Sequence, residues 1–517
     1  MPSLRTNALP ISSAGFALRP VAQACALGLA LLLAGCGGSS SPAVVPAYAS
    51  GNLLVSRTAY AGVAATVTIG QTLPGGGIAT TDGSFPNVFK NEVPDPSFGV
   101  SSPIFLDTRS PSGALIGTLA VDPAKITTSF ASKSELALNL STDGSVVNFM
   151  GYKALINQLD VSNSNTAAVV DTTNPVTTTF QRAIAQVDLN TGALTVAGVN
   201  AYSGNNGRAA VLANGTYYMV GNAGNGSGDG NTLSALSDNT GVQSISLASL
   251  ASGVSSPVGA VQGTYGSLTG YQRGFSLAQL PNPATPGVNY AADKTGKDDN
   301  FRGMTIYNNT LYVTKGSGSN GVNTVYQVGA AGALANGGKL DGTAVFSILP
   351  GFNTLSEKVA ETKATLTATP HPFGLWFADA NTLFVADEGD GVRTGVAGKV
   401  TTFAGLQEYK LVSGTWTKVA TFQLGLLNQA AYTNGLPWNV QTDGLRNLTG
   451  RVNADGSYTL YATTSTVSDE LTHDLGADPN ELVSITITAS STPANTSFSV
   501  LQTAAYGERF GGVALVR

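Results

Sequence analysis

Charged side chains are scarce in this chain, and several of them recur at similar places in its pattern. The 517 residues include only 26 Lys and Arg and 31 Asp and Glu. Four arginines and one histidine stand at or just before the start of apolar segments: Arg208, Arg302, His371, Arg446 and Arg509. A guanidinium group binds a carboxylate or another planar oxyanion through paired hydrogen bonds, so this set, with Glu508, forms candidate ligand-binding or catalytic residues. The alternative is that the arginines pair with Asp299, Asp443 and Glu508 and only stabilise the fold.

His371 is the best candidate for a general base. It is one of only two histidines, the other being His473, and it lies between Pro370 and Pro372. A catalytic imidazole needs a carboxylate to orient it, and Asp387 or Glu388 could do so. The alternative is a histidine that forms backbone hydrogen bonds in a turn.

Two acidic segments could supply oxygen ligands for calcium. The first contains Asp387, Glu388 and Asp390, and the second contains Asp469 and Glu470. Calcium prefers carboxylate and carbonyl oxygens, but neither segment has the ligand spacing of an EF-hand loop. Solvated acidic loops are the commoner explanation.

Several other chemistries are excluded by the residues present. Cys25 and Cys36 are the only cysteines, so the chain beyond them has no disulfide, thiol nucleophile or cysteine ligand. Net charge is -5, and no cluster of Lys and Arg is available to bind nucleic acid. The segment Gly316–Gly321 matches a dinucleotide-binding pattern, but a strand and not a helix follows it.

The N-terminal residues are typical of an export signal. Arg5 and Arg19 precede an apolar run from Val21 to Leu33, which is too short to span a membrane. The run ends in Leu33-Ala34-Gly35-Cys36, which resembles the bacterial lipobox. The resemblance implies cleavage before Cys36 and acylation of its thiol, for example with palmitate. An ordinary secretory signal or a short buried helix is the alternative.

This resemblance also predicts the domain boundaries and the location. Residues 1–35 would be the signal, 36–50 a flexible Gly-, Ser- and Pro-rich tether, and 51–517 the folded domain. Gly37 after the cysteine implies sorting to the outer membrane in lipoproteins, with the periplasmic or surface side left open.

A repeated hairpin pattern predicts an all-β fold. Short apolar strands flank two-residue turns, of which Asn214-Gly215 and Asp455-Gly456 are examples. Asn-Gly and Asp-Gly favour a type I′ hairpin turn, because both central residues need a positive φ. Similar turns stand at residues 143, 308 and 380. A second pair of strands follows each hairpin, and four strands per unit is the blade of a β-propeller.

The two ends of the chain complete one further unit. Arg509–Arg517 resembles an innermost strand with no partner after it, and Gly51–Arg57 resembles a second strand with no partner before it. Pairing the two would close the ring and remove exposed strand edges. We therefore expect six blades. Seven is the alternative, because the turns at 214 and 308 are 94 residues apart.

Two of the hairpins resemble known propeller repeats. Thr310–Gly316 is similar to the YVTN type, and Thr382–Gly389 is similar to the NHL type found in six-bladed lactonase-like propellers. Such propellers usually bind ligands where the innermost strands begin. The sequence predicts a binding lipoprotein whose partner is a glycan, a small molecule or a protein. The alternative is a hub enzyme, a metal-assisted hydrolase, lactonase or lyase.

Overall fold

We analysed a computed structural model of the chain. The structure describes residues 48–74, 76–92, 99–133, 135–224, 238–259, 264–265, 268–269, 285–288, 299–316, 320–356, 369–391, 403–468 and 476–517. Cys36 and the metal candidates Asp469 and Glu470 lie outside these ranges, as does His473. No helix in the described ranges is long and apolar enough to cross a membrane.

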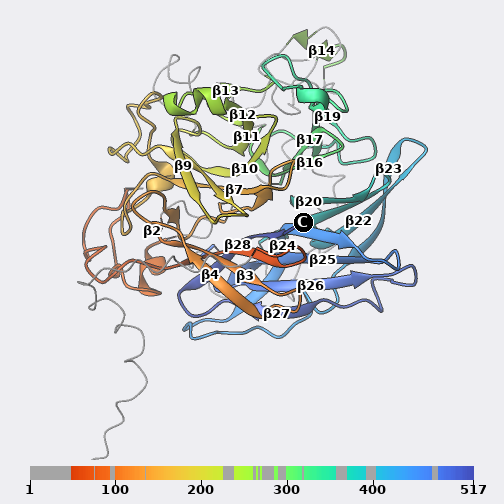
Figure 1. Ribbon diagram of the computed structural model, residues 1–517. Helices are drawn as coiled ribbons and strands as arrows, with labels where there is room; N and C mark the ends of the chain where they lie inside the picture. The colour runs from red at the N-terminus through yellow and green to blue at the C-terminus, as the bar shows by residue number, and fades with distance from the viewer. Residues whose placement is uncertain are drawn as a thin grey trace, which may run out of the picture. The chain divides into compact units, whose positions relative to one another are not determined.

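Six antiparallel sheets of four strands form a six-bladed β-propeller, which confirms the predicted fold (Figure 1). Each blade is given from its innermost strand outward. The first blade is β28 (Glu508–Leu515), β1 (Leu53–Ala59), β3 (Ile104–Arg109) and β4 (Leu115–Ala120), the second is β6 (Asn139–Leu140), β7 (Val146–Tyr152), β8 (Arg182–Asp188) and β9 (Leu194–Val199), and the third is β10 (Gly207–Ala213), β11 (Thr216–Gly221), β12 (Gly241–Ser246) and β13 (Ser256–Pro257). The fourth blade is β16 (Phe301–Tyr307), β17 (Thr310–Lys315), β18 (Thr324–Val328) and β19 (Phe346–Ile348), the fifth is β20 (Pro372–Asp379), β21 (Thr382–Asp387), β22 (Gly405–Val412) and β23 (Thr415–Phe422), and the sixth is β24 (Val440–Val452), β25 (Tyr458–Ser468), β26 (Glu481–Ile487) and β27 (Ser499–Thr503).

The long interval between the turns at 214 and 308 does not contain a seventh blade among its described residues. It contributes only one small extra sheet, made of β14 (Thr264–Tyr265) and β15 (Leu268–Thr269). The alternative of seven blades is therefore wrong. A further small sheet pairs β2 (Ser101–Ser102) with β5 (Thr128–Ser129).

The hairpin turns follow the local chemistry of their residues. Asn214 and Gly215 have φ values of 49° and 69°, and Asn308 and Asn309 have 45° and 54°. These two turns have the positive φ at both central residues that type I′ requires. At Asp143-Gly144 and Asp455-Gly456 only the glycine has a positive φ, so the type I′ expectation is wrong there.

These Asp-Gly turns are stabilised by the aspartate side chain instead. The Oδ1 atom of Asp143 accepts a hydrogen bond from the N–H of Ser145 at 3.0 Å. Asp455 accepts one from the N–H of Ser457 at the same distance. An aspartate that bonds the backbone two residues ahead fixes a turn without a positive φ of its own.

Strand β28 closes the ring by pairing with β1. Leu53 lies opposite Leu515, and Ala59 lies opposite Glu508. On its other side β1 pairs with β3, so strands from both ends of the chain share one blade. The predicted closure is confirmed.

The core is divided into clusters that lie between neighbouring blades. Alternate residues of a strand face opposite sides of its sheet. Leu53 and Val55 accordingly pack against Tyr461 of the preceding blade, while Leu54 packs with residues of the following blade such as Phe149. Because both faces of β1 are covered, apolar residues stand at consecutive positions, as in Leu53-Leu54-Val55.

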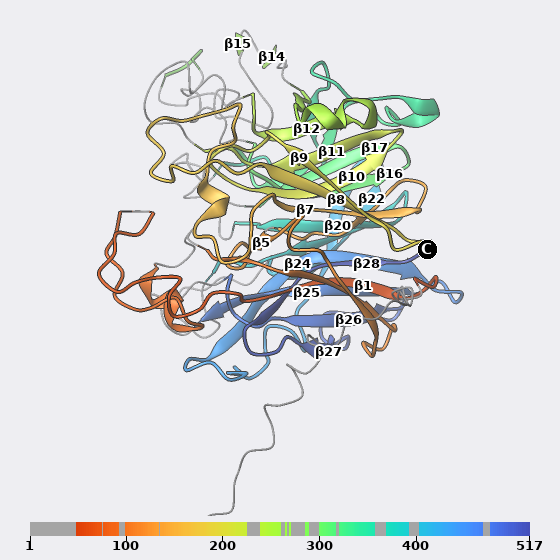
Figure 2. The ribbon, with the colours of Figure 1, turned by 60° about the vertical axis from the view of Figure 1, so that its left-hand side comes forward.

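The blades present two different ends. We call the end at which the innermost strands begin the loop face, and the end with the tight turns between first and second strands the turn face. The insertion 60–103, which joins β1 to β3, extends from the loop face and packs Val67 and Phe89 against Phe130. In Figure 2 this red and orange insertion lies at one side of the stacked strands, and the C-terminus, marked C, lies at the opposite side.

Candidate functional site

Glu388 lies at the centre of the charged residues on the loop face. It follows β21, and its side chain is only 13% exposed. The Nε atom of Arg446 is 3.2 Å from its Oε2 atom. Burial raises the pKa of Glu388, but the positive charges of Arg302, Arg446, Lys133 and His371 outweigh burial and lower this pKa. The glutamate is therefore a carboxylate at neutral pH.

Arg208 is the most deeply buried arginine near Glu388. Its Nη1 atom donates to the carbonyl oxygen of Phe301 at 2.6 Å and to the side chain of Asn300. Among the residues that the structure describes, its buried Nε atom has no hydrogen-bond partner. Burial lowers the pKa of Arg208, and the charge of Arg302 lowers it further. Arg208 thus keeps a buried donor with no acceptor in the described part of the chain.

The structure brings four of the predicted site residues together. Arg208, Arg302, His371 and Arg446 all interact electrostatically with Glu388 or with one another. Arg208, Arg302 and Arg446 are 4%, 9% and 7% exposed, so solvent screens their charges weakly. We call these residues with Glu388 the arginine group. Its cations outnumber its carboxylate, which suits an added anion.

Asp387 is held by N–H donors. The N–H of His371 donates to its Oδ2 at 2.7 Å, the side chain of Gln407 donates to the same atom at 3.1 Å, and the N–H of Gly389 donates to its Oδ1 at 3.0 Å. Burial raises the pKa of Asp387 to about 6. This carboxyl group fixes the end of β21 against the start of β20.

His371 makes its contacts with Asp387 and Glu388 through its backbone. Its N–H donates to Asp387, and its carbonyl oxygen accepts from the N–H of Glu388 at 3.0 Å. These bonds orient the chain at the start of β20 but do not orient the imidazole ring. A histidine bonded through its backbone in a turn, the structural alternative, accounts for them.

The residues proposed as calcium ligands do not form a cation site in the described ranges. No group of three or more His, Cys, Asp or Glu side chains there could hold a metal ion. Asp387 is surrounded by N–H donors, Glu388 is paired with Arg446, and Asp390 is exposed. Their neighbours suit anions and not a divalent cation.

Glu508 and Arg509 lie next to each other in sequence but have different partners. Glu508 pairs with Arg57 at 2.5 Å, and Arg57 also contacts Asp107 at 3.1 Å. The Nε atom of Arg509 donates to the carbonyl oxygen of Phe130 at 2.5 Å. Glu508 is therefore part of an ion-pair network within the first blade, apart from the arginine group.

The structure also contains a second set of buried polar residues, which was not predicted from the sequence. Glu135 accepts hydrogen bonds from Thr128 at 2.7 Å, from the N–H of Ser129 at 3.1 Å and from the hydroxyl of Tyr152. Burial raises its pKa despite these bonds. Arg182 lies over the ring of Tyr152, 5.5 Å from its centroid, and burial lowers its pKa to about 10.

Arg182 joins the connection between β7 and β8 to the segment that leads into β10. Arg182 donates to the carbonyl oxygens of Ser162 and Ser164, each at 2.8 Å, and from Nε to that of Asn205, also at 2.8 Å. The scarcity of charge in the sequence could have drawn attention to Glu135 and Arg182, because both are charged residues within mostly uncharged stretches. Their distant partners left no pattern in the sequence.

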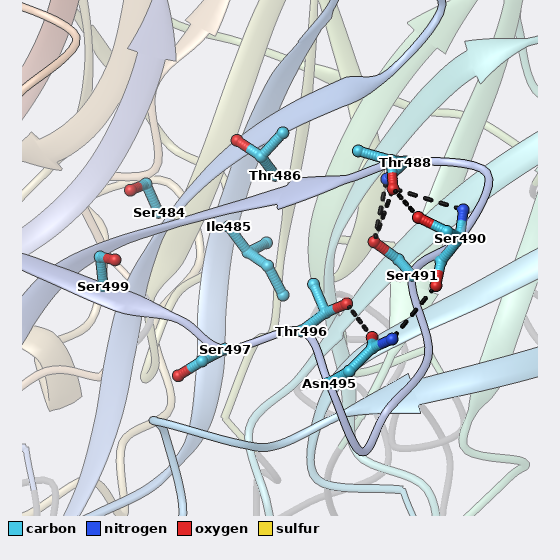
Figure 3. Close-up of a pocket in the computed structure, with 10 residues that line it drawn as sticks. All are labelled: Ser484, Ile485, Thr486, Thr488, Ser490, Ser491, Asn495, Thr496, Ser497 and Ser499. Carbon is cyan, nitrogen blue, oxygen red and sulfur yellow. Dashed lines mark hydrogen bonds between the residues drawn. The ribbon is translucent and has the colours of Figure 1, made fainter.

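A shallow pocket also lies on the outer part of the last blade (Figure 3). Its volume is about 440 Å³, and it is lined by hydroxyl and amide side chains with no charged or aromatic residue. Several of these groups bond to one another, as Asn495 does with Thr496 at 2.8 Å. Nothing in this pocket can transfer a proton at neutral pH.

The fold defines the chain as a six-bladed β-propeller protein. No family model matches it, and no curated protein matches it. Solved structures similar to it include a putative 6-phosphogluconolactonase from Bacteroides uniformis, with 10% identity, a TM-score of 0.35 and 78% of each chain covered. Another is the β-propeller domain of the trilobed protease from Pyrococcus furiosus, with 7% identity, a TM-score of 0.26, and 78% of this chain and 87% of that chain covered. Similarity at this level carries no information about activity.

Proposed function

We propose that this protein is an exported lipoprotein, anchored to the outer membrane through Cys36, whose propeller binds a carboxylate-bearing ligand at the loop face. The observation that carries the proposal is the arginine group, in which Arg208, Arg302 and Arg446 lie around the carboxylate of Glu388. The ligand would be a small acid, an acidic glycan or an acidic segment of a protein.

The arrangement favours an anion for two physical reasons. Guanidinium groups held close together repel one another, and an added carboxylate reduces this repulsion. The buried Nε donor of Arg208 also lacks an acceptor among the described residues, and an unpaired buried donor costs about 1–3 kcal/mol. A ligand oxygen would satisfy this donor.

The binding proposal is tested by thermal melting of the folded domain with matched probes. D-glucuronate and glutarate should raise the melting temperature, whereas neutral D-glucose should not. Arg208→Lys keeps the positive charge but loses the planar guanidinium group that can donate two hydrogen bonds to a carboxylate. This variant should therefore show a much smaller rise in melting temperature. Equal shifts with glucose, or an unchanged shift in Arg208→Lys, would contradict a carboxylate site at the arginine group.

The anchor is tested separately with Cys36→Ser. The unaltered protein should incorporate labelled palmitate and sediment with membranes, because several acyl chains give stable anchoring. Cys36→Ser should incorporate no label and stay in the soluble fraction. A variant that is still labelled would place the lipid elsewhere and overturn this part of the proposal.

The hub-enzyme alternative has less support from the geometry. The contacts that join His371 to Asp387 are made by the backbone, and the described acidic residues form no metal cluster. A lactone hydrolysis assay that compares the unaltered protein with His371→Ala tests the enzyme alternative. Hydrolysis that is lost in this variant would favour the enzyme.

A further inference from the structure

A second cavity lies inside the ring at the turn face. Its volume is about 600 Å³, which is within the ~300–1,000 Å³ typical of ligand pockets. Residues of all six blades line it, contributed by the innermost strands β6, β10, β16, β20, β24 and β28 and their adjoining turns. All its lining residues belong to the described ranges.

A layer of close backbone contacts separates this cavity from the arginine group. The lining ends at Gly303, Gly374 and Asn447, and it does not include Arg302 or Arg446. A Cβ atom at Gly303 would come within 2.0 Å of the carbonyl oxygen of Phe373, so the strands meet there backbone to backbone. The two sites therefore open on opposite faces.

The walls of the cavity expose both polar and apolar groups. Leu140, Ile306 and Leu448 line it and are only partly buried, so each leaves apolar surface uncovered. Tyr307 and Trp376 add aromatic surface. These five side chains can contact an apolar or aromatic body of limited size.

The side-chain charges at the cavity are of one sign. Arg451 and Arg517 line it and are exposed, and its lining contains no Asp or Glu. The side chains of Arg451 and Arg517 have no ion-pair or hydrogen-bond partner among the described residues. Exposed arginines beside these apolar side chains are complementary to a molecule with an apolar body and an anionic end.

We propose that the turn-face end of the channel binds a small amphipathic anion, with its apolar body between the innermost strands and its anionic group beside Arg451. This site is distinct from the carboxylate site on the loop face. Contact with these apolar side chains would add to the affinity, because solvent weakens the attraction of exposed charges. The arginines would select anionic over neutral molecules.

The test uses 8-anilinonaphthalene-1-sulfonate as the anionic probe and N-phenyl-1-naphthylamine as its neutral counterpart. Fluorescence titration should show a single saturable sulfonate per chain and weaker binding of the neutral probe. Arg451→Gln should weaken sulfonate binding about threefold, as expected for one exposed charge, and leave the neutral probe unchanged. Lys125→Gln removes an exposed charge elsewhere and should change neither.

Thr449→Trp fills the channel and should abolish binding of both probes. If this variant melts early, charge reversal by Arg451→Glu replaces it, and sulfonate binding should then fall further than in Arg451→Gln. Sulfonate binding that is absent, or that persists unchanged in Thr449→Trp and Arg451→Glu, would overturn the proposal. Equal binding of the two probes would also overturn the proposal, because the arginines would then not favour the anionic probe over the neutral one.

Discussion

At the scale of single residues, burial separates two glutamate–arginine pairs of similar chemistry. Glu388 and Arg446 are 13% and 8% exposed in their side chains, whereas Glu508 and Arg57 are 27% and 16% exposed. Removing one partner of a buried pair leaves the other charge uncompensated in a medium that solvates it poorly. The more exposed pair is partly stabilised by water.

Glu388→Gln should therefore be much more destabilising than Glu508→Gln. We expect a loss of about 3 kcal/mol or more for Glu388→Gln, since three arginines lose their shared carboxylate. Glu508→Gln should cost about 1 kcal/mol or less. Urea unfolding at pH 7 measures both, and equal losses would show that Glu388 does not balance the arginine group.

Asp160 should make the stability depend on pH. Burial raises its pKa from 3.8 to about 7. Between these values the folded protein keeps a proton that the unfolded chain has released, so stability falls as pH rises from about 4 to 7. Asp160→Asn should remove this contribution, on the order of 2–4 kcal/mol, and keep the bond that Asn163 donates.

The control for this experiment is Asp188→Asn. Asp188 lies in an exposed turn, where backbone N–H groups of Thr191 and Asn190 lower its pKa. Replacing Asp188 should leave the decrease in stability between pH 4 and 7 unchanged. Urea unfolding at several pH values measures the profiles, and identical slopes in the unaltered protein and Asp160→Asn would refute the assignment.

At the scale of elements, local signals were readable from the sequence and distant contacts were not. The hairpin at Asn214-Gly215 and the closing strand at Arg509–Arg517 were both predicted. Turn residues and the alternation of apolar residues are features of neighbouring positions, so they can be recognised in the sequence. The bond from Arg446 to Glu388 joins residues 58 positions apart, and the bond from Arg57 to Glu508 joins residues 451 apart. Such pairings depend on how blades meet, which no local pattern encodes.

Gly512 shows how closely the innermost strands approach. A Cβ atom there would lie 2.4 Å from the backbone nitrogen of Leu138 and 2.5 Å from the carbonyl oxygen of Leu136. Neither backbone atom can rotate away, so Gly512→Ala should cost about 2 kcal/mol or more. A Cβ atom at Gly77 would have no other atom within 4 Å, and Gly77→Ala should stay within about 0.5 kcal/mol. Thermal melting compares the two, and similar melting temperatures would contradict the close approach.

At the scale of the whole molecule, the ring depends on its last strand. Phe510 and Val513 of β28 pack in one interblade cluster, and Ala514 packs in the next. Deleting residues 508–517 should expose both clusters and the inner edge of β1, and the cooperative melt should be lost.

Deletion of residues 1–44 is the matched control for this truncation. The sequence predicts that these residues belong to the signal and the tether, outside the folded domain. Their removal should leave the melting temperature unchanged. Calorimetry measures both truncations, and a cooperative melt that survives the loss of β28 would show that the ring does not need closure.

The pairing of β1 with β28 also has a consequence for the order of events during synthesis. β1 is the first strand to leave the ribosome, and its inner neighbour is the last, with Leu53 and Leu515 side by side only at the end. Contacts this distant in sequence form slowly, because the ordering of the intervening chain must come first. The ring therefore cannot close until the residues of β28 have been made.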